Sequence, residues 1–254
     1  MSGKSMVIIG AGLGGLATGC YARMNGYRTR IFEQHTAPGG VCTAWQRQGY
    51  TIDGDIEWLM GCQPGSRYYH LYQELGVIKD CRLLPLNEFC SFLDEKTGRS
   101  MAVTSDLDRL AAGMKAMAPI DGGAIEEFIN GCRTMQGFTG VPQPEMVELF
   151  KKYNISIAEF ARRIEDPFLR WSISNMNELP ETPVTVLFFI LGGMADRQYG
   201  LVEGGSLNFS LAVARRYQDL QGRSPTGRTL QRSWWKTTGR WASDWLTATS
   251  TGQT

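Results

Sequence analysis

The chain has 254 residues, a length that allows one large domain or two intertwined ones. Hydrophobic residues make up 43% of it and charged residues 20%, which is ordinary for a soluble globular protein. The formal net charge of +1 argues against a protein that holds nucleic acid through phosphate contacts. We therefore expect no nucleic-acid partner.

Cysteine and histidine usage predicts no metal site. The six cysteines form no C-x-x-C pair, and no His/Cys cluster has the spacing of metal ligands. We interpret the cysteines as reduced, mostly buried thiols, which favours a cytoplasmic protein. The only two histidines, His35 and His70, are predicted to be surface or loop residues. No signal peptide is expected, because the first apolar segment leads directly into glycines.

The first predicted element is a strand over residues 6–9, which ends in a G-x-G-x-x-G turn. Its continuous apolar run predicts a strand buried in a parallel sheet. Gly10 permits the tight turn, Gly12 lets the backbone approach a pyrophosphate, and Gly15 lets the next helix pack closely on the sheet. With Gly14, these glycines form a predicted phosphate site at the helix N-terminus.

The context of the turn supports a dinucleotide site. Residues 13–25 have the composition of a helix, with Gly26 as its C-cap. Residues 28–32 read as the second strand, which leads directly to Glu33. An acidic residue there suits the ribose hydroxyls of an adenine dinucleotide, and we include the adjacent Gln34 in the predicted site. The alternative is a structural glycine turn with an exposed Glu33.

Further along the chain, the pattern predicts strands near residues 50–54 and 82–94 and a helix over 66–75. A helical middle, about residues 105–195, interrupts the nucleotide-binding frame. Its predicted helices cover residues 106–117, 123–135, 144–152, 155–164, 167–176 and 184–195. The last of these is too short to span a bilayer, which takes about 20 residues. We interpret it as a buried helix, with a substrate tunnel wall or a patch that enters a membrane surface as alternatives.

The final predicted helix covers residues 207–220 and follows Gly204-Gly205-Ser206, with Ser206 as its N-cap. The motifs together resemble the phytoene desaturase and carotenoid isomerase group of FAD-dependent oxidoreductases, which are related to amine oxidases. The resemblance covers about residues 5–220. The residues that carry it are Gly10, Gly12, Gly15, Glu33, Gly39-Gly40, Gly49-Tyr50, Asp53 and the Gly204–Ser206 segment.

This resemblance implies an α/β fold, with a Rossmann-like FAD-binding domain containing a parallel sheet of ββα type and an inserted, mostly helical substrate domain. Residues 1–100 would begin the FAD-binding domain, 101–200 the substrate region, and 201–220 the return helix. The resemblance also implies that Gly39 and Gly40 lie close to the FAD phosphates, and that the region of Asp53 approaches the flavin. The implied reaction is hydride transfer between an apolar, polyisoprenoid or lipid-like substrate and FAD.

No residue is predicted to be catalytic. Tyr50, Asp53 and Asp55 lie near the expected flavin region, but we interpret them as structural polar residues. Peripheral membrane contact and the oligomeric state stay open. So do two other functions: an amine oxidase-like flavoenzyme, and an inactive fragment that retains only part of the dinucleotide site.

The chain departs from this family in two places. Val41 stands where many relatives have a polar or basic residue, so it is left out of the predicted site. Family members are also longer, with a Gly-rich flavin-contacting segment near the C-terminus that nothing here matches. The resemblance therefore implies that the C-terminal part is missing.

The tail, residues 221–254, differs from the rest of the chain. It contains four of the seven tryptophans and five basic residues against one acidic residue, with no visible helix or strand period. A disordered basic tail is one interpretation. A reading shifted to the third base of each codon would instead give a strand, a polar turn and a second strand. We therefore hypothesise a frameshift near residues 221–222, which the coding DNA would test.

Overall fold

A computed structural model describes residues 4–138 and 141–223. The chain divides into two compact units. Among the described residues, the first unit contains 4–57, 70–83 and 202–223, and the second contains 58–69, 84–138 and 141–201. Of the predicted tail, residues 224–254 lie outside the described residues, so the frameshift hypothesis stays a prediction.

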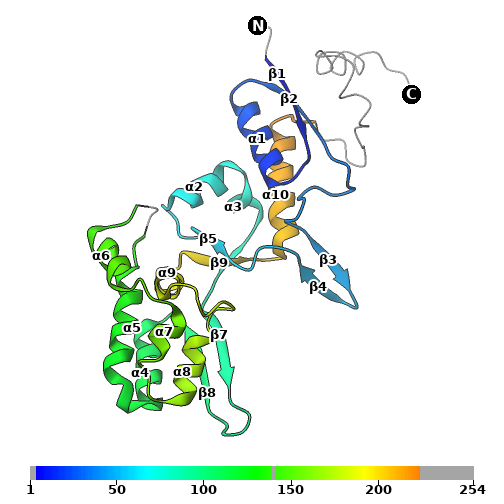
Figure 1. Cartoon of the computed structure of the whole chain (residues 1–254). Helices are drawn as coiled ribbons and strands as arrows, with labels where there is room; N and C mark the ends of the chain where they lie inside the picture. Colours follow the sequence, from blue (N-terminus) through cyan, green and yellow to red (C-terminus); the bar gives the residue numbers. More distant parts are fainter. Residues whose placement is uncertain (1–3, 139–140, 224–254) are drawn as a thin grey trace, which may run out of the picture. The chain divides into compact units, whose positions relative to one another are not determined.

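The first unit is built on a strand–helix–strand motif. Strands β1 (Ser5–Ile9) and β2 (Arg28–Phe32) are parallel and joined by helix α1 (Leu13–Met24). Helix α1 packs against β2 and against the last helix, α10 (Gly205–Asp219), as Figure 1 shows. After α10 the chain returns to β2, where the carbonyl of Arg223 accepts a 3.0 Å hydrogen bond from the Ile31 N–H. The resulting arrangement is the expected Rossmann-like start of an α/β domain.

Helix α10 packs closely against α1 at Gly19 and is joined to β2 through Tyr217. A Cβ added to Gly19 of α1 would lie 2.7 Å from the ring of Tyr217 and 2.9 Å from Ile31, so only glycine permits this approach. The hydroxyl of the buried Tyr217 lies 2.9 Å from that of Thr29 on β2, at hydrogen-bonding distance. The return helix is thereby fixed to the strand that precedes the predicted ribose-binding residue.

Strand β1 is less buried than its sequence predicted. Met6, Val7 and Ile8 are half-buried, and Ile9 is 63% exposed. The prediction rested on the continuous apolar run, which is typical of strands in parallel sheets that are covered on both faces. Among the described residues β1 pairs only with β2, so one edge of this apolar strand is uncovered.

A β-hairpin and two short helices complete the first unit. Strands β3 (Ala44–Arg47) and β4 (Tyr50–Asp53) are antiparallel, with Gln48 and Gly49 both at positive φ in the connecting turn. Helices α2 (Arg67–Glu74) and α3 (Val77–Asp80) follow, and the first residues of α2 belong to the second unit. The strand 50–53 and the helix near 66–75 are as predicted.

The second unit combines short strands with a helical body (Figure 1). Strand β9 (Tyr199–Val202) lies between β5 (Leu59–Met60) and β6 (Leu83–Pro85). Strands β7 (Glu88–Leu93) and β8 (Ser100–Thr104) form a second hairpin. The helices are α4 (Leu107–Met117), α5 (Gly122–Thr134), α6 (Pro144–Lys152), α7 (Ile157–Ala161), α8 (Pro167–Ser174) and α9 (Val184–Ala195), with a 3₁₀ turn over Pro119–Asp121.

The core of the second unit forms around α9. Leu187, Phe188 and Leu191 are fully buried, and Phe188 makes edge-to-face contacts with Phe128 and Tyr153. The prediction of a buried helix here is confirmed. In the described part of the chain, no helix has both the length and the apolar character needed to cross a bilayer.

A buried carboxylate connects the start of α8 to the 3₁₀ turn that precedes α5. Asp121 is 4% exposed and accepts hydrogen bonds from the backbone N–H groups of Glu165 (2.6 Å) and Asp166 (2.9 Å). Asp166 in turn caps α8 by accepting from the Leu169 N–H, and it pairs with Arg99 at 3.0 Å. These contacts fix the start of α8, because the Leu169 N–H in its first turn and the two amides that precede the helix all have acceptors.

Candidate dinucleotide site

The N-terminus of α1 has the features of an anion site. Gly12 is its N-cap in an extended conformation, and no side chain caps the helix there. The first turn of the helix contains no acidic residue. The positive end of the helix dipole is therefore uncompensated by the side chains of the helix itself, which favours binding of a phosphate.

The glycines of the turn are required for different reasons. Gly10 has φ +92°, a conformation that side-chain-bearing residues rarely adopt, and its N–H donates to the Phe32 carbonyl at 2.7 Å. A Cβ on Gly15 would lie 2.1 Å from the Gly10 carbonyl oxygen. The backbone conformation at Gly10 and the close packing at Gly15 therefore demand glycine.

Gly12 differs, because nothing in the protein demands a glycine there. Its φ is −66°, and the nearest atom to an added Cβ would be the Gly39 carbonyl oxygen, 4.0 Å away. Gly14 likewise has open space at its Cβ position and is exposed. The open space above these two residues lies at the uncapped helix end, where a pyrophosphate could approach the backbone.

Glu33 is buried, with 7% of its surface exposed, so the alternative of an exposed residue is wrong. One carboxylate oxygen accepts a 2.6 Å hydrogen bond from the Ala11 N–H, and the other accepts a 2.8 Å bond from the His35 N–H. Each carboxylate oxygen has capacity for a second donor. Glu33 therefore holds the glycine turn in place and retains acceptor sites for further hydroxyl groups. Its neighbour Gln34 is exposed.

The second glycine pair lies against the first turn. The Gly39 N–H donates to the Ala11 carbonyl at 2.8 Å, and Gly39 forms an isolated bridge with Gly12. A Cβ on Gly40 would lie 3.3 Å from the Gly12 Cα. The structure thus brings Gly10, Gly12, Gly14, Gly15, Glu33, Gly39 and Gly40 together around one helix end, although the sequence separates them by up to 30 positions. Val41, which was left out of the predicted site, is 79% exposed.

A carboxylate from a distant part of the chain binds the N-terminus of α10. Asp53 accepts a 2.8 Å hydrogen bond from the Ser206 N–H and a further short bond from the Ser206 hydroxyl. Burial opposes ionisation of Asp53, but the bonds from Ser206 outweigh it and hold the pKa of Asp53 below its ordinary value. The N-terminus of α10 therefore already has its counter-charge, in contrast with that of α1.

Ser206 is not the N-cap that the sequence predicted. The N-cap position is Gly204, at φ +84°, and the Ser206 hydroxyl instead accepts the Ile56 N–H at 2.7 Å. Asp53 supplies the capping interaction from 153 positions away in the chain, which no local pattern could indicate. Our interpretation of Asp53 as a structural polar residue agrees with these bonds.

The described residues contain no cluster of three or more metal-ligating side chains. All six cysteines are free in the structure, and four of them are buried. Burial raises the pKa of the Cys20 and Cys62 thiols to about 11, so both are protonated at neutral pH. His35 and His70 are exposed, as predicted.

Comparison with known proteins agrees with this geometry. The family described as "NAD(P)-binding Rossmann-like domain" matches residues 8–75. A lycopene-forming phytoene desaturase of Pseudescherichia vulneris is 44% identical over 126 residues, covering 50% of this chain and 25% of that protein. A lycopene-forming phytoene desaturase of a Paracoccus species is 23% identical over 265 residues, covering 89% of this chain and 52% of that protein.

Among solved structures, an oxidoreductase from Methanosarcina mazei matches with a TM-score of 0.54 at 21% identity, over 88% of this chain and 51% of that one. At this identity the match shows the fold alone. The chain spans about half the length of this protein, and about a quarter and about half of the two desaturases. The first unit thus contains a Rossmann-like fold, and the chain is similar in sequence to proteins named phytoene desaturase, as its motifs indicated.

Proposed function

We propose that this chain binds FAD at the N-terminus of α1 and forms part of an oxidoreductase that acts on an apolar, polyisoprenoid or lipid-like substrate. The observation that carries the proposal is the open space above Gly12 at an uncapped helix end, with the buried Glu33 nearby. A dinucleotide needs these two features together: a phosphate site and an acceptor for the ribose hydroxyls. The relationship to proteins named phytoene desaturase favours FAD and an apolar substrate.

The residues present fit such a cofactor. The N–H groups at the start of α1 would bind the pyrophosphate, with Gly12 and Gly14 leaving room for it. Glu33 would accept from the ribose hydroxyls, and Gly39 and Gly40 would border the phosphates. Bound FAD would supply the redox chemistry, and these residues would bind and orient it.

The chain's own contribution to the reaction is therefore positioning. The two hydrogen bonds that Glu33 accepts fix its carboxylate before any ligand arrives. The contacts of Gly39 with Ala11 and Gly12 fix the second loop against the first. A preformed site of this kind saves the entropy of ordering two loops when the cofactor binds. We assign no catalytic acid or base.

The proposal is tested by titrating the purified protein with FAD and, separately, with NAD and NADP, using calorimetry. We expect FAD to bind in a 1:1 ratio and more tightly than either nicotinamide dinucleotide. Anaerobic addition of a polyisoprenoid such as phytoene should then bleach the flavin absorbance of the loaded protein. Binding of NAD or NADP in preference to FAD, or of no dinucleotide, would overturn the cofactor assignment.

A further inference from the structure

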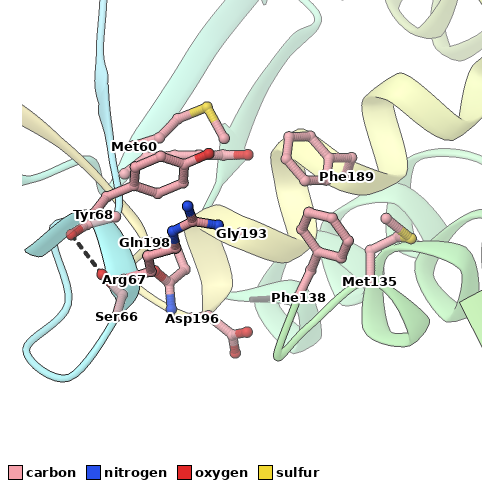
Figure 2. Close-up of a pocket in the computed structure, with 12 residues that line it drawn as sticks. Met60, Ser66, Arg67, Tyr68, Met135, Phe138, Phe189, Gly193, Asp196 and Gln198 are labelled. Atoms are coloured by element: carbon pink, nitrogen blue, oxygen red, sulfur yellow. Dashed lines mark hydrogen bonds between the residues drawn. The ribbon is translucent and has the colours of Figure 1, made fainter. Parts of the chain in front are cut away.

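The second unit contains a small cavity that the dinucleotide site does not use (Figure 2). Six apolar or aromatic side chains from four segments line it: Met60, Tyr68, Met135, Phe138, Phe189 and Tyr199. Figure 2 shows Met60 and Tyr68 on one side and Met135, Phe138 and Phe189 on the other. The rings of Phe138 and Phe189 meet edge to face at 5.4 Å, so this wall is packed in a fixed geometry.

The cavity volume, about 60 Å³, limits what can enter it. A cavity needs about 10–15 Å³ of volume to hold one water, so this cavity holds about four to six water-sized groups. That is the size of a short branched end of a molecule, with the remainder outside. The apolar walls favour carbon groups over water at this position.

Polar side chains also line the cavity, and most of them already have partners. The Asp196 carboxylate accepts from the Gly137 N–H and from the Gln136 side chain. The Gln198 amide donates to Gln63 at 3.1 Å, and the Ser66 hydroxyl donates to the Gly61 carbonyl at 2.9 Å. The hydrogen bonds of these groups are therefore satisfied within the protein.

Arg67 is the charged lining residue that differs from Asp196 in this respect. It lines the same cavity at the start of α2, yet in residues 4–138 and 141–223 its guanidinium has no hydrogen-bond or ion-pair partner. A guanidinium offers five N–H donors in a fork that matches a carboxylate. A cation beside an apolar cavity is complementary to a ligand that has an anionic group next to a short carbon chain.

We propose that this cavity binds the carboxylate end of an apolar, lipid-like molecule, with the carboxylate paired to Arg67 and the adjacent carbons between Tyr68 and Phe138. The inference rests on the proposed function, to which it adds a ligand class for the second unit: an apolar, lipid-like molecule that ends in a carboxylate. It depends only on residues of the second unit, whereas the dinucleotide site lies in the first.

The test uses cis-parinaric acid, a fluorescent polyene acid, and its methyl ester, which lacks the charge. Both are titrated into the purified wild-type protein below their critical micelle concentrations. We expect the acid to bind at least about tenfold more tightly than the ester, since charge-assisted hydrogen bonds are the strong ones. Equal affinities, or no binding of either probe, would overturn the proposal.

Matched variants assign the preference to one residue. Arg67→Leu should abolish the preference for the acid while leaving ester binding unchanged, and Arg67→Lys should keep part of it. Arg109→Leu, at an exposed arginine on α4 outside this cavity, should retain the full preference. A preference that survives Arg67→Leu would contradict the assignment.

FAD binding is measured on the same samples, so that the two proposals can fail separately. Acid-selective binding by a protein that binds no FAD would contradict the proposed function and leave the cavity assignment standing. FAD binding without any preference for the acid would contradict the cavity assignment and leave the proposed function standing. Unchanged far-ultraviolet circular dichroism of each variant shows that the fold is retained.

Discussion

The carboxylate of Glu33 accepts a 2.6 Å hydrogen bond from the backbone N–H of Ala11, the residue between the first two glycines of the turn. The end of β2 is thereby tied to the end of β1, 22 positions earlier in the chain. Glu33 therefore stabilises the fold, in addition to its proposed role in binding a ligand. Because of this double role, a substitution of Glu33 should change two measurable quantities: the affinity for FAD and the stability of the fold.

Glu33→Ala should weaken FAD binding and also lower stability. The variant leaves the N–H groups of Ala11 and His35 without their acceptor, at a cost of about 1–3 kcal/mol in the free energy of unfolding. Chemical denaturation measures the stability, and calorimetric titration measures the affinity. Unchanged FAD affinity in a folded Glu33→Ala protein would refute the ribose role and leave only the structural one.

Gly15→Ala should destabilise the protein directly. Its Cβ would lie 2.1 Å from the Gly10 carbonyl oxygen, so α1 would have to move away from the turn. We expect a loss of at least about 1–3 kcal/mol, the usual cost of overpacking. Thermal unfolding measures this loss. A melting temperature equal to that of the wild type would mean that the helix is not held as closely as the structure shows.

Asp53→Asn should loosen the start of α10. The amide retains one acceptor oxygen but loses the charge that pairs with the helix dipole and with the Ser206 N–H. A decrease of about 0.5–2 kcal/mol in unfolding free energy is expected, as for the loss of an N-cap. Hydrogen exchange of the amides at residues 205–208 should accelerate, while that of α4 should not. Equal exchange rates in variant and wild type would contradict this role.

Asp166 should make stability depend on pH in the acidic range. Burial opposes its ionisation, but the Leu169 N–H and the Arg99 guanidinium outweigh burial and lower the pKa of Asp166 in the folded state. Because the folded pKa lies below the unfolded value of about 3.9, the stabilisation is complete above that pH and is lost as the pH falls through the folded pKa. Asp166→Asn should therefore flatten the decline in stability below pH ~4.

Acid titrations followed by circular dichroism compare the two proteins. The variant should also be less stable than the wild type at pH 7, because Arg99 loses its ionic partner. Identical acid-unfolding curves would contradict the contribution of this carboxylate.

The sequence predicted those features that depend on local chain chemistry. The glycine turn, α1, β2 and the apolar helix α9 follow from short-range patterns, and the structure confirms each of them. It also predicted that the glycines and Glu33 belong to one site. Whether they bind FAD stays a proposal.

Features that depend on distant residues could not be predicted in this way. The burial of β1 depends on what lies at its second edge, and the apolar run of residues 6–9 contains no information about that edge. Ser206 has the chemistry of an N-cap, but a carboxylate 153 positions away takes the role. Arg67 and Phe138 lie far apart in the sequence, and only the fold places them in one cavity.

The proposed FAD site requires a dinucleotide to approach the backbone at Gly12. Gly12→Ala tests it most directly, because the structure leaves 4.0 Å between the added Cβ and the nearest protein atom, and the φ of −66° suits alanine. Gly113→Ala is the matched control, at a glycine of α4 with equally open surroundings. We expect Gly12→Ala to fold with a stability lower by at most about 1 kcal/mol, the usual cost of alanine at an N-cap, and to lose at least about tenfold in FAD affinity, while Gly113→Ala loses none. Wild-type FAD affinity in the Gly12→Ala protein would show that no dinucleotide approaches the backbone at Gly12.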